Sequence, residues 1–204
     1  MTRKALSGRE SNKANIQSRV VQCALQLFRE KGVDATTMET VAEVAGITKR
    51  TLYRYFPKKE AIADAYWQEN VREKVAMLPE LLQAYPDTRA RLMAIFLDAS
   101  AGLRADPEIA RMHFSYQFQQ LGRELEGKAG LANDFTAFLT AVIYKGQTSG
   151  DVRPDIPAEQ LAWQVQLLFA GICLTWFANP DVYALEARLT EAIACFMDGA
   201  GIAH

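Results

Sequence analysis

The sequence predicts an all-α fold in which a small N-terminal helical domain precedes a larger C-terminal helical domain. Three observations support this prediction. Residues 36–56 carry the start, spacing and stop signals of two short helices joined by a tight turn. Beyond residue 80 no alternating strand pattern occurs, and prolines separate long helical runs. At 204 residues and 50% hydrophobic composition, the chain can bury a sizeable core, as one large or two small domains.

The first helix is predicted from apolar residues at helical spacing and from its end signal. Lys31-Gly32 supplies a cation and a helix stop. Residues 1–14 are polar, so we expect a basic disordered arm before the helix. No apolar run follows Arg3 and Lys4, and no signal peptide is therefore predicted. The apolar face consists of Ile16, Val20, Ala24, Leu27 and Phe28.

The next two helices have the signals of a helix-turn-helix. Thr36 and Glu39 have the spacing of a capping box, and Gly46 can adopt the left-handed conformation that ends a helix. Thr48 is a favourable N-cap for the second helix, which Pro57 stops. Such a motif presents its second helix to the DNA major groove. The expected core of the three helices is Val20, Leu27, Phe28, Val41, Ala45, Leu52 and Phe56.

Charge is distributed unevenly along the chain. Through residue 59, twelve Lys and Arg residues outnumber five acids, whereas nineteen acids outnumber eleven bases in the remainder. The net charge of −1 therefore conceals one basic and one acidic part. This asymmetry indicates that only the N-terminal part meets a polyanion such as DNA. The alternative is that the basic N-terminus is a solvated tail.

At these residues the chain resembles the TetR family of bacterial transcriptional regulators. The resemblance covers about residues 15–67 and is weaker beyond, with an echo at Gly150-Asp151-Val152-Arg153-Pro154-Asp155 ahead of a predicted helix. It implies a dimer that binds DNA and responds to a small effector. The matching residues are Leu27-Phe28, Gly32, Thr36-Thr37, Val41-Ala42, Ala45-Gly46-Ile47-Thr48, Thr51-Leu52-Tyr53, Tyr55-Phe56 and Lys59-Glu60.

We therefore expect a disordered arm at 1–14, a helix-turn-helix DNA-binding domain at 15–60 and an effector-binding and dimerisation domain at 61–204. Lys49 and Arg50 begin the recognition helix and are candidates for base edges. Hydroxyl and ammonium donors fix the register on phosphates without reading sequence. The phosphate candidates are Thr37, Thr51, Tyr53, Tyr55 and Lys59, and Thr48 is a candidate contact whose main predicted role is the helix cap.

The C-terminal part contains two helices suited to pairing with a second copy. The run Leu161–Phe177 is apolar almost all the way round, but it is short for a membrane span, which needs about 20 apolar residues. We predict a homodimer through this helix and the last one, and no membrane association; the alternative is a central helix in a monomer. Helices are predicted at about residues 60–78, 88–105, 107–121, 124–148, 157–178 and 182–199.

The body combines aromatic residues with interleaved polar ones, as a ligand site requires. The resemblance implies that a small hydrophobic or aromatic effector binds here and changes the separation of two DNA-binding domains through the helix at 60–78. For any single residue, a role in ordinary core packing is the simpler interpretation. The candidate ligand-binding residues are Phe96, Ser100, His113, Tyr116, Gln117, Phe138, Trp163, Gln166 and Phe169.

Neither a metal, a cofactor nor a catalytic centre is predicted. Cys23, Cys173 and Cys195 lack metal-ligand spacing and indicate reduced thiols in a cytoplasm. With two histidines and no phosphate loop or nucleophile motif, an enzyme fused to a DNA-binding domain is disfavoured. The prediction is a ligand-responsive repressor of a palindromic operator. The alternative is a DNA-binding regulator without a small-molecule effector, constitutive or controlled by a protein partner.

Overall fold

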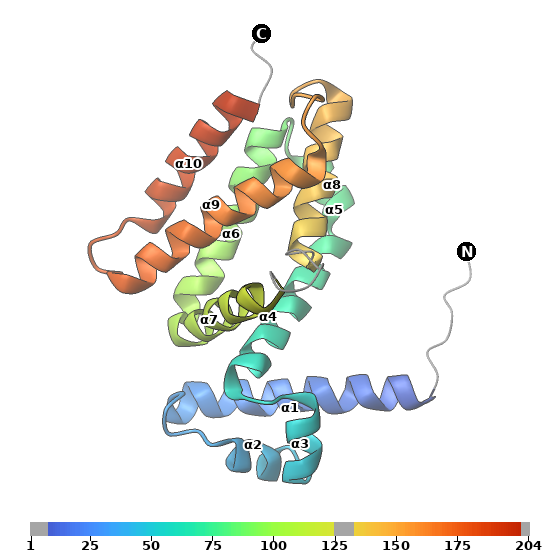
Figure 1. Ribbon diagram of the computed structural model, residues 1–204, viewed down its shortest axis with the longest axis vertical. Coiled ribbons are helices and arrows are strands. Elements are labelled where there is room, and N and C mark those ends of the chain that lie inside the picture. Colours follow the sequence, from blue (N-terminus) through green and yellow to red (C-terminus); the bar gives the residue numbers. More distant parts are fainter. Residues whose placement is uncertain (1–7, 125–132, 201–204) are drawn as a thin grey trace. The chain divides into compact units, whose positions relative to one another are not determined.

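The computed structural model describes residues 8–124 and 133–200, and these ranges contain helices and no strand (Figure 1). The all-α prediction is confirmed. The chain divides into two compact units, Met1–Trp67, called the headpiece, and Gln68–His204, called the body. The helices are α1 (Gly8–Lys31), α2 (Met38–Val44), α3 (Lys49–Tyr55), α4 (Lys59–Ala76), α5 (Leu78–Ala84), α6 (Thr88–Ala105), α7 (Pro107–Glu124), α8 (Asp134–Ser149), α9 (Ala158–Ala178) and α10 (Leu185–Ala200).

The headpiece core is the one expected from the apolar spacing. Helix α1 packs on α2, and α2 packs on α3. The start of α4 adds Ile62, which is completely buried. Helix α1 begins at Gly8, so the prediction of a disordered arm is wrong for residues 8–14, while residues 1–7 lie outside the described ranges. The predicted core residues are all buried: Val20, Leu27, Phe28, Val41, Ala45, Leu52 and Phe56.

The body is built around four helices, each packed against two of the others. Helix α9 packs against α8 and α10, and α6 packs against α8 and α10 in turn, while α7 lies on α9 and α6. Two predictions of helix extent were wrong. The helix predicted at 124–148 begins at Asp134, with residues 125–132 outside the described ranges, and the short helix α5 was not predicted as a separate element.

Side chains at the helix ends fix where the body helices begin and stop. Asp87 accepts a hydrogen bond from the Ala90 backbone N–H (2.8 Å) at the start of α6, and Asn133 accepts one from Thr136 (2.9 Å) at the start of α8. Helix α8 ends at Gly150, whose φ of 85° is unfavourable for residues with a side chain. These caps satisfy backbone groups that helix ends leave unpaired.

Two ion pairs join the C-terminal half of α4 to other helices of the body. Arg72 Nε lies 3.0 Å from Asp134 Oδ2 at the start of α8, and Lys74 Nζ lies 2.9 Å from Asp98 Oδ2 on α6. All four side chains are substantially exposed, so each pair contributes little to stability by itself. The pairs show that the C-terminal half of α4 lies beside α6 and the start of α8.

Helix α9 is buried on one face and exposed on the other. The prediction placed one face against the chain's own domain and the other against a second copy, and the buried face agrees with the first part of it. By length and composition alone α9 could cross a membrane, and 39% of its most apolar stretch is buried within the chain. One such helix is weak evidence for a membrane span, because core helices of soluble proteins pass the same test. The exposed stripe comprises Trp163, Gln164, Leu168, Gly171, Leu174 and Thr175.

Candidate nucleic-acid interface

One face of the recognition helix α3 is buried in the headpiece core, and the opposite face is exposed. Leu52 is completely buried and Phe56 nearly so, which fixes one face of the helix in the headpiece core. The Thr48 side chain accepts a hydrogen bond from the Thr51 backbone N–H (3.1 Å), and this confirms the predicted N-cap. The other face is exposed and carries Thr48, Lys49, Arg50, Tyr53 and Arg54.

The turn between α2 and α3 depends on Gly46. Its φ of 63° lies in the left-handed region, as predicted, and its backbone N–H donates to Glu43 at 3.0 Å. The next N–H, from half-buried Ile47, donates to the Ala42 carbonyl at 3.0 Å. These bonds complete the end of α2 and set the direction in which α3 begins.

The start of α2 differs from the predicted capping box. Thr37, rather than Thr36, is the N-cap and accepts from the Thr40 N–H at 3.1 Å. Thr36 is buried and its hydroxyl donates to the Gly32 carbonyl at 2.8 Å. The capping-box prediction was wrong because the Thr36 hydroxyl is bonded to carbonyls at and just after the end of α1, and the next residue caps α2 instead. Thr37 is exposed at the N-terminus of α2, a position suited to a phosphate.

Glu39, freed from the capping box, forms an ion pair with the first residue of α3. Lys49 Nζ lies 3.4 Å from Glu39 Oε1, and both side chains are well exposed. A hydrogen bond from its own backbone N–H and then the Lys49 ammonium lower the pKa of the Glu39 carboxyl, which keeps it ionised at neutral pH. The structure therefore places an acid beside one of the two predicted base-reading cations.

Arg54 is a surface cation that sequence reasoning did not assign to the interface. It lies one turn beyond Arg50 on the exposed face, and its guanidinium donates to the Tyr55 hydroxyl at 3.1 Å and lies 4.9 Å from the centre of that ring. The spacing of four residues from Arg50 was the signal that could have found it. Tyr55 itself is half-buried, whereas Tyr53 is 45% exposed.

Lys59 lies at the first position of α4 and holds a neighbouring loop. Its ammonium donates to the Val33 carbonyl at 2.6 Å, between α1 and α2. An ammonium has three donors, so this bond leaves capacity for a phosphate. Half-buried Thr51 shares a hydrogen bond with Thr48 between their hydroxyls at 2.9 Å. Of the predicted phosphate candidates, three thus lie on α3 itself, Thr37 is the N-cap of α2 and Lys59 begins α4.

The predicted ligand residues are partly gathered in one aromatic cluster of the body. Phe96 and Phe169 are stacked with ring centres 4.7 Å apart, and Phe135 lies 6.0 Å from Phe169. Phe114 joins them at 6.3 Å from Phe169 and contacts Phe177 edge-on. Rings from four helices, α6 to α9, therefore meet here. The sequence prediction included Phe96 and Phe169 but missed Phe114, Phe135 and Phe177, because spacing along a helix does not show which rings of different helices meet.

Polar groups border this cluster at several predicted positions. Gln166 accepts a hydrogen bond from the buried Thr136 hydroxyl at 2.6 Å. Buried Ser100 donates to the Leu97 carbonyl in its own helix at 2.8 Å. Phe138 is buried, whereas Trp163 is 42% exposed on the outer stripe of α9 and lies outside the cluster. His113 contacts the Phe114 ring edge-on, and Tyr116 and Gln117 are half-buried on α7.

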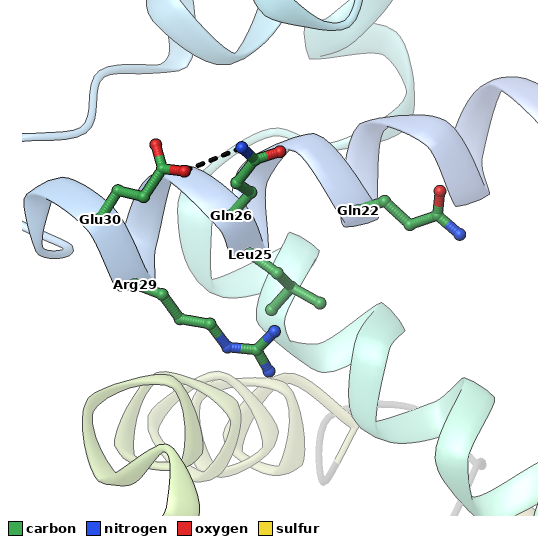
Figure 2. Close-up of a pocket in the computed structure, with 5 residues that line it drawn as sticks. All are labelled: Gln22, Leu25, Gln26, Arg29 and Glu30. Carbon is green, nitrogen blue, oxygen red and sulfur yellow. Dashed lines mark hydrogen bonds between the residues drawn. The ribbon is translucent and has the colours of Figure 1, made fainter.

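A surface pocket of about 390 Å³ lies on the headpiece and is lined by α1 alone (Figure 2). Leu25 is its one apolar lining residue, and Gln26 donates to Glu30 at 2.8 Å along its edge. Its remaining lining residues, Gln22 and Arg29, are also polar. Sites for hydrophobic ligands are mostly apolar and enclosed. This pocket is open and lined by a single helix, so it does not have the character of an effector site.

The cysteines and acids of the described ranges form no metal-binding cluster. Cys173 is buried, Cys23 is half-buried and Cys195 is exposed on α10. Burial raises the pKa of the Cys173 thiol far above its ordinary value, so this residue is an inert part of the core. No paired thiols occur among these three residues.

The scan against family models identifies the same helix-turn-helix region. Residues 20–66, which contain α2, α3 and the buried part of α1, match the model of the bacterial regulatory proteins of the TetR family. Residues 20–66 are a TetR family DNA-binding domain. The match covers the residues that build the headpiece core and present α3.

Relatives and solved structures extend the similarity to TetR family proteins along most of the chain. It is 24% identical over 202 residues to the HTH-type transcriptional repressor KstR2 of Rhodococcus jostii, covering 95% of each chain. Thermus thermophilus FadR, a TetR family repressor solved with lauroyl-CoA, has a TM-score of 0.77 at 19% identity and covers 92% of this chain and 96% of its own. Bacillus subtilis FadR, solved with stearoyl-CoA, has a TM-score of 0.63 at 17% identity, covering 89% and 98%. At these identities the two structures show the fold.

Proposed function

We propose that this protein is a homodimeric TetR family repressor that binds a palindromic operator through α3 and is released by a hydrophobic effector. The observation that carries the proposal is the exposed cationic face of α3, anchored by Leu52 and capped by Thr48. A short helix with one face fixed in a core and an exposed cationic face fits the major groove. The excess of bases through residue 59 and of acids in the remainder also favours an orientation with the N-terminal part on the DNA.

Within this interface we assign base reading first to Arg50. It is exposed at the start of α3, and an arginine can bind the O6 and N7 atoms of guanine with two hydrogen bonds. Arg54, one turn later, is a second candidate from its exposure. Hydroxyl and ammonium donors around the helix would fix the register on phosphates. These are Thr37, Thr51, Tyr53, Tyr55 and Lys59.

The proposed dimer uses the outer stripe of α9 together with α10. Leu168 and Leu174 are 42% and 40% exposed on a helix whose other face is core, and Gly171 between them has no atom within 4 Å of where a side chain would begin. An interior glycine costs a helix up to about 1 kcal/mol, so its presence at an open position favours close approach by another helix. Pairing across a twofold axis would give two copies of α3 for two half-sites.

The effector we propose is a long-chain acyl-CoA or a similar hydrophobic molecule. The support is the cluster of Phe96, Phe114, Phe135 and Phe169 in the body, bordered by the hydrogen-bonded pair of Thr136 and Gln166. Apolar walls with a few orienting polar groups are typical of ligand sites. A similar repressor solved with lauroyl-CoA and a similar transcriptional regulator solved with stearoyl-CoA favour this ligand class over aromatic drugs.

Helix α4 is the proposed connection between effector and headpiece. Its ion-pair partners Asp98 and Asp134 lie beside cluster residues Phe96 and Phe135 along α6 and α8. A ligand that separates these rings would move the residues to which α4 is attached. An effector that prefers the form with reduced DNA affinity by about 1–3 kcal/mol would change operator affinity about 5- to 150-fold.

Replacing Arg50 with alanine is expected to weaken operator binding and relax base preference at one position of each half-site. The loss of a two-bond contact to a base corresponds to about 1–3 kcal/mol per half-site. The measurement is a titration of wild-type and R50A protein against the operator and against operators substituted at each position. An equal loss of affinity for operator and random DNA would instead identify Arg50 as a phosphate contact.

Electrophoretic mobility shift with DNA flanking the protein's own gene tests the function as a whole. We expect a discrete complex that palmitoyl-CoA releases and free CoA does not, because CoA lacks the acyl chain that the aromatic cluster would bind. A complex that no acyl-CoA or other hydrophobic ligand releases would support the second candidate, a regulator without a small-molecule effector. Absence of any sequence-preferring complex would contradict the proposal.

A further inference from the structure

The acid beside the recognition helix has a consequence for how strictly this protein discriminates between DNA sequences. Glu39 lies in the first turn of α2 and Lys49 is the first residue of α3, and their charged atoms are 3.4 Å apart. The pair therefore bridges the two helices of the DNA-binding motif. Its exposed position allows both side chains to meet DNA.

A lysine on this surface has two ways to act. An unrestrained ammonium on a flexible four-carbon stem can reach a phosphate on any sequence, and each such contact strengthens binding to all DNA. An ammonium held by a carboxylate cannot move to a phosphate without leaving its partner. Arg50, the adjacent cation, is instead suited to base edges. The ion pair thus reduces the sequence-independent part of binding while leaving Arg50 in place.

We propose that Glu39 is a specificity-determining residue, which restrains Lys49 and thereby suppresses binding to non-operator DNA. The inference rests on the proposed use of α3 in DNA binding and concerns the balance between operator and random sequences. The contribution of an exposed ion pair to folding is small, so stability gives little reason for the pair. Its effect is expected in DNA affinity.

A simpler interpretation is that Glu39 acts only as a negative charge near the start of α2, where acids stabilise a helix. Glu43 provides a matched control, because it lies one turn further along α2, is exposed and carries the same charge. Replacing either residue with glutamine removes one negative charge from the same helix. Only the replacement of Glu39 also releases Lys49.

The experiment compares wild type, E39Q, E43Q, K49M and the double variant E39Q/K49M in the full-length protein. Dissociation constants are measured by fluorescence anisotropy on operator and on random duplex of equal length, each at several salt concentrations. Circular dichroism melting checks that all variants are folded. The random-duplex measurements do not require a palindromic operator, so they test this inference separately from the proposed function.

We expect E39Q to bind random DNA about three- to tenfold more tightly at ~0.1 M salt and to steepen the salt dependence by about 0.9 per subunit, as one additional phosphate contact from each Lys49 would. Operator affinity should rise less, so the ratio of operator to random affinity should fall. E43Q should change both affinities by a smaller, equal factor, and K49M should abolish the effect of E39Q. Equal effects of E39Q and E43Q, or an effect of E39Q that persists with K49M, would overturn the inference.

Discussion

Replacing Leu168 and Leu174 together with aspartate is expected to convert the protein to a monomer and to lower operator affinity by about 10²- to 10⁴-fold, the usual gain from linking two binding units. Both leucines lie on the exposed stripe of α9, with Gly171 between them. A carboxylate buried in an apolar helix interface without a partner is strongly unfavourable. Sedimentation equilibrium measures the mass, and anisotropy with operator DNA measures the affinity.

The matched control for this pair is Tyr144→Asp on α8. Tyr144 is 63% exposed and apolar in large part, but it lies outside the proposed α9–α10 surface. The variant Y144D should remain dimeric with unchanged operator affinity. A double leucine variant that is still dimeric at micromolar concentration would show that other surfaces pair the subunits.

Replacing Gly146 with alanine is expected to destabilise the body by about 1–3 kcal/mol, the usual cost of overpacking a well-filled core. A methyl group at this position would overlap Thr88 Oγ1 and lie 2.7 Å from Val152 Cγ2. Both neighbours are short, β-branched side chains that cannot move aside easily, and Thr88 and Val152 are buried. Urea unfolding followed by circular dichroism gives the free energy of unfolding.

The control for this substitution is Gly199→Ala. Gly199 also lies in a helix, but no atom stands within 4 Å of its would-be side chain. Alanine favours helix over glycine, so G199A should not lower the free energy of unfolding. If G146A were as stable as wild type, then α8 and the start of α6 would not approach as closely as the structure indicates.

The local signals of the helix-turn-helix could be read from the sequence because each depends on neighbouring residues. Thr48 caps α3 through a bond to Thr51, and Gly46 ends α2 by its own backbone preference. The capping box failed at Thr36 because that residue is bonded to the Gly32 and Leu27 carbonyls of the preceding segment. The hydrogen bonds of Thr36 to the preceding segment therefore outweighed the local capping pattern, and Thr37 caps α2.

The parts of the site that involve contacts between separate elements could not be predicted. Nothing in the spacing of Glu39 and Lys49 indicated an ion pair, and the bond from Lys59 to Val33 spans 26 residues. The same reason applies to the ring cluster in the body, where Phe135 and Phe169 meet from different helices. Composition predicted an aromatic interior, but which rings meet is decided by how the helices pack.

The apolar run of α9 predicted one face packed in its own domain and the other against a second copy. An apolar run predicted burial, and residues such as Phe169 and Cys173 are indeed buried, whereas Trp163, Leu168 and Leu174 are exposed. A single chain has no further helix to cover that stripe within the described residues. Sequence alone does not distinguish burial within one chain from burial between two copies.

Footprinting of the full-length protein on the DNA flanking its own gene tests the central claim most directly, namely that two copies of the cationic α3 surface read a twofold-symmetric site. We expect two protected, inverted half-sites with centres about 34–36 Å apart or at a related helical spacing, and R50A should reduce protection in both halves equally. A single protected half-site, or uniform protection without sequence preference, would contradict the account.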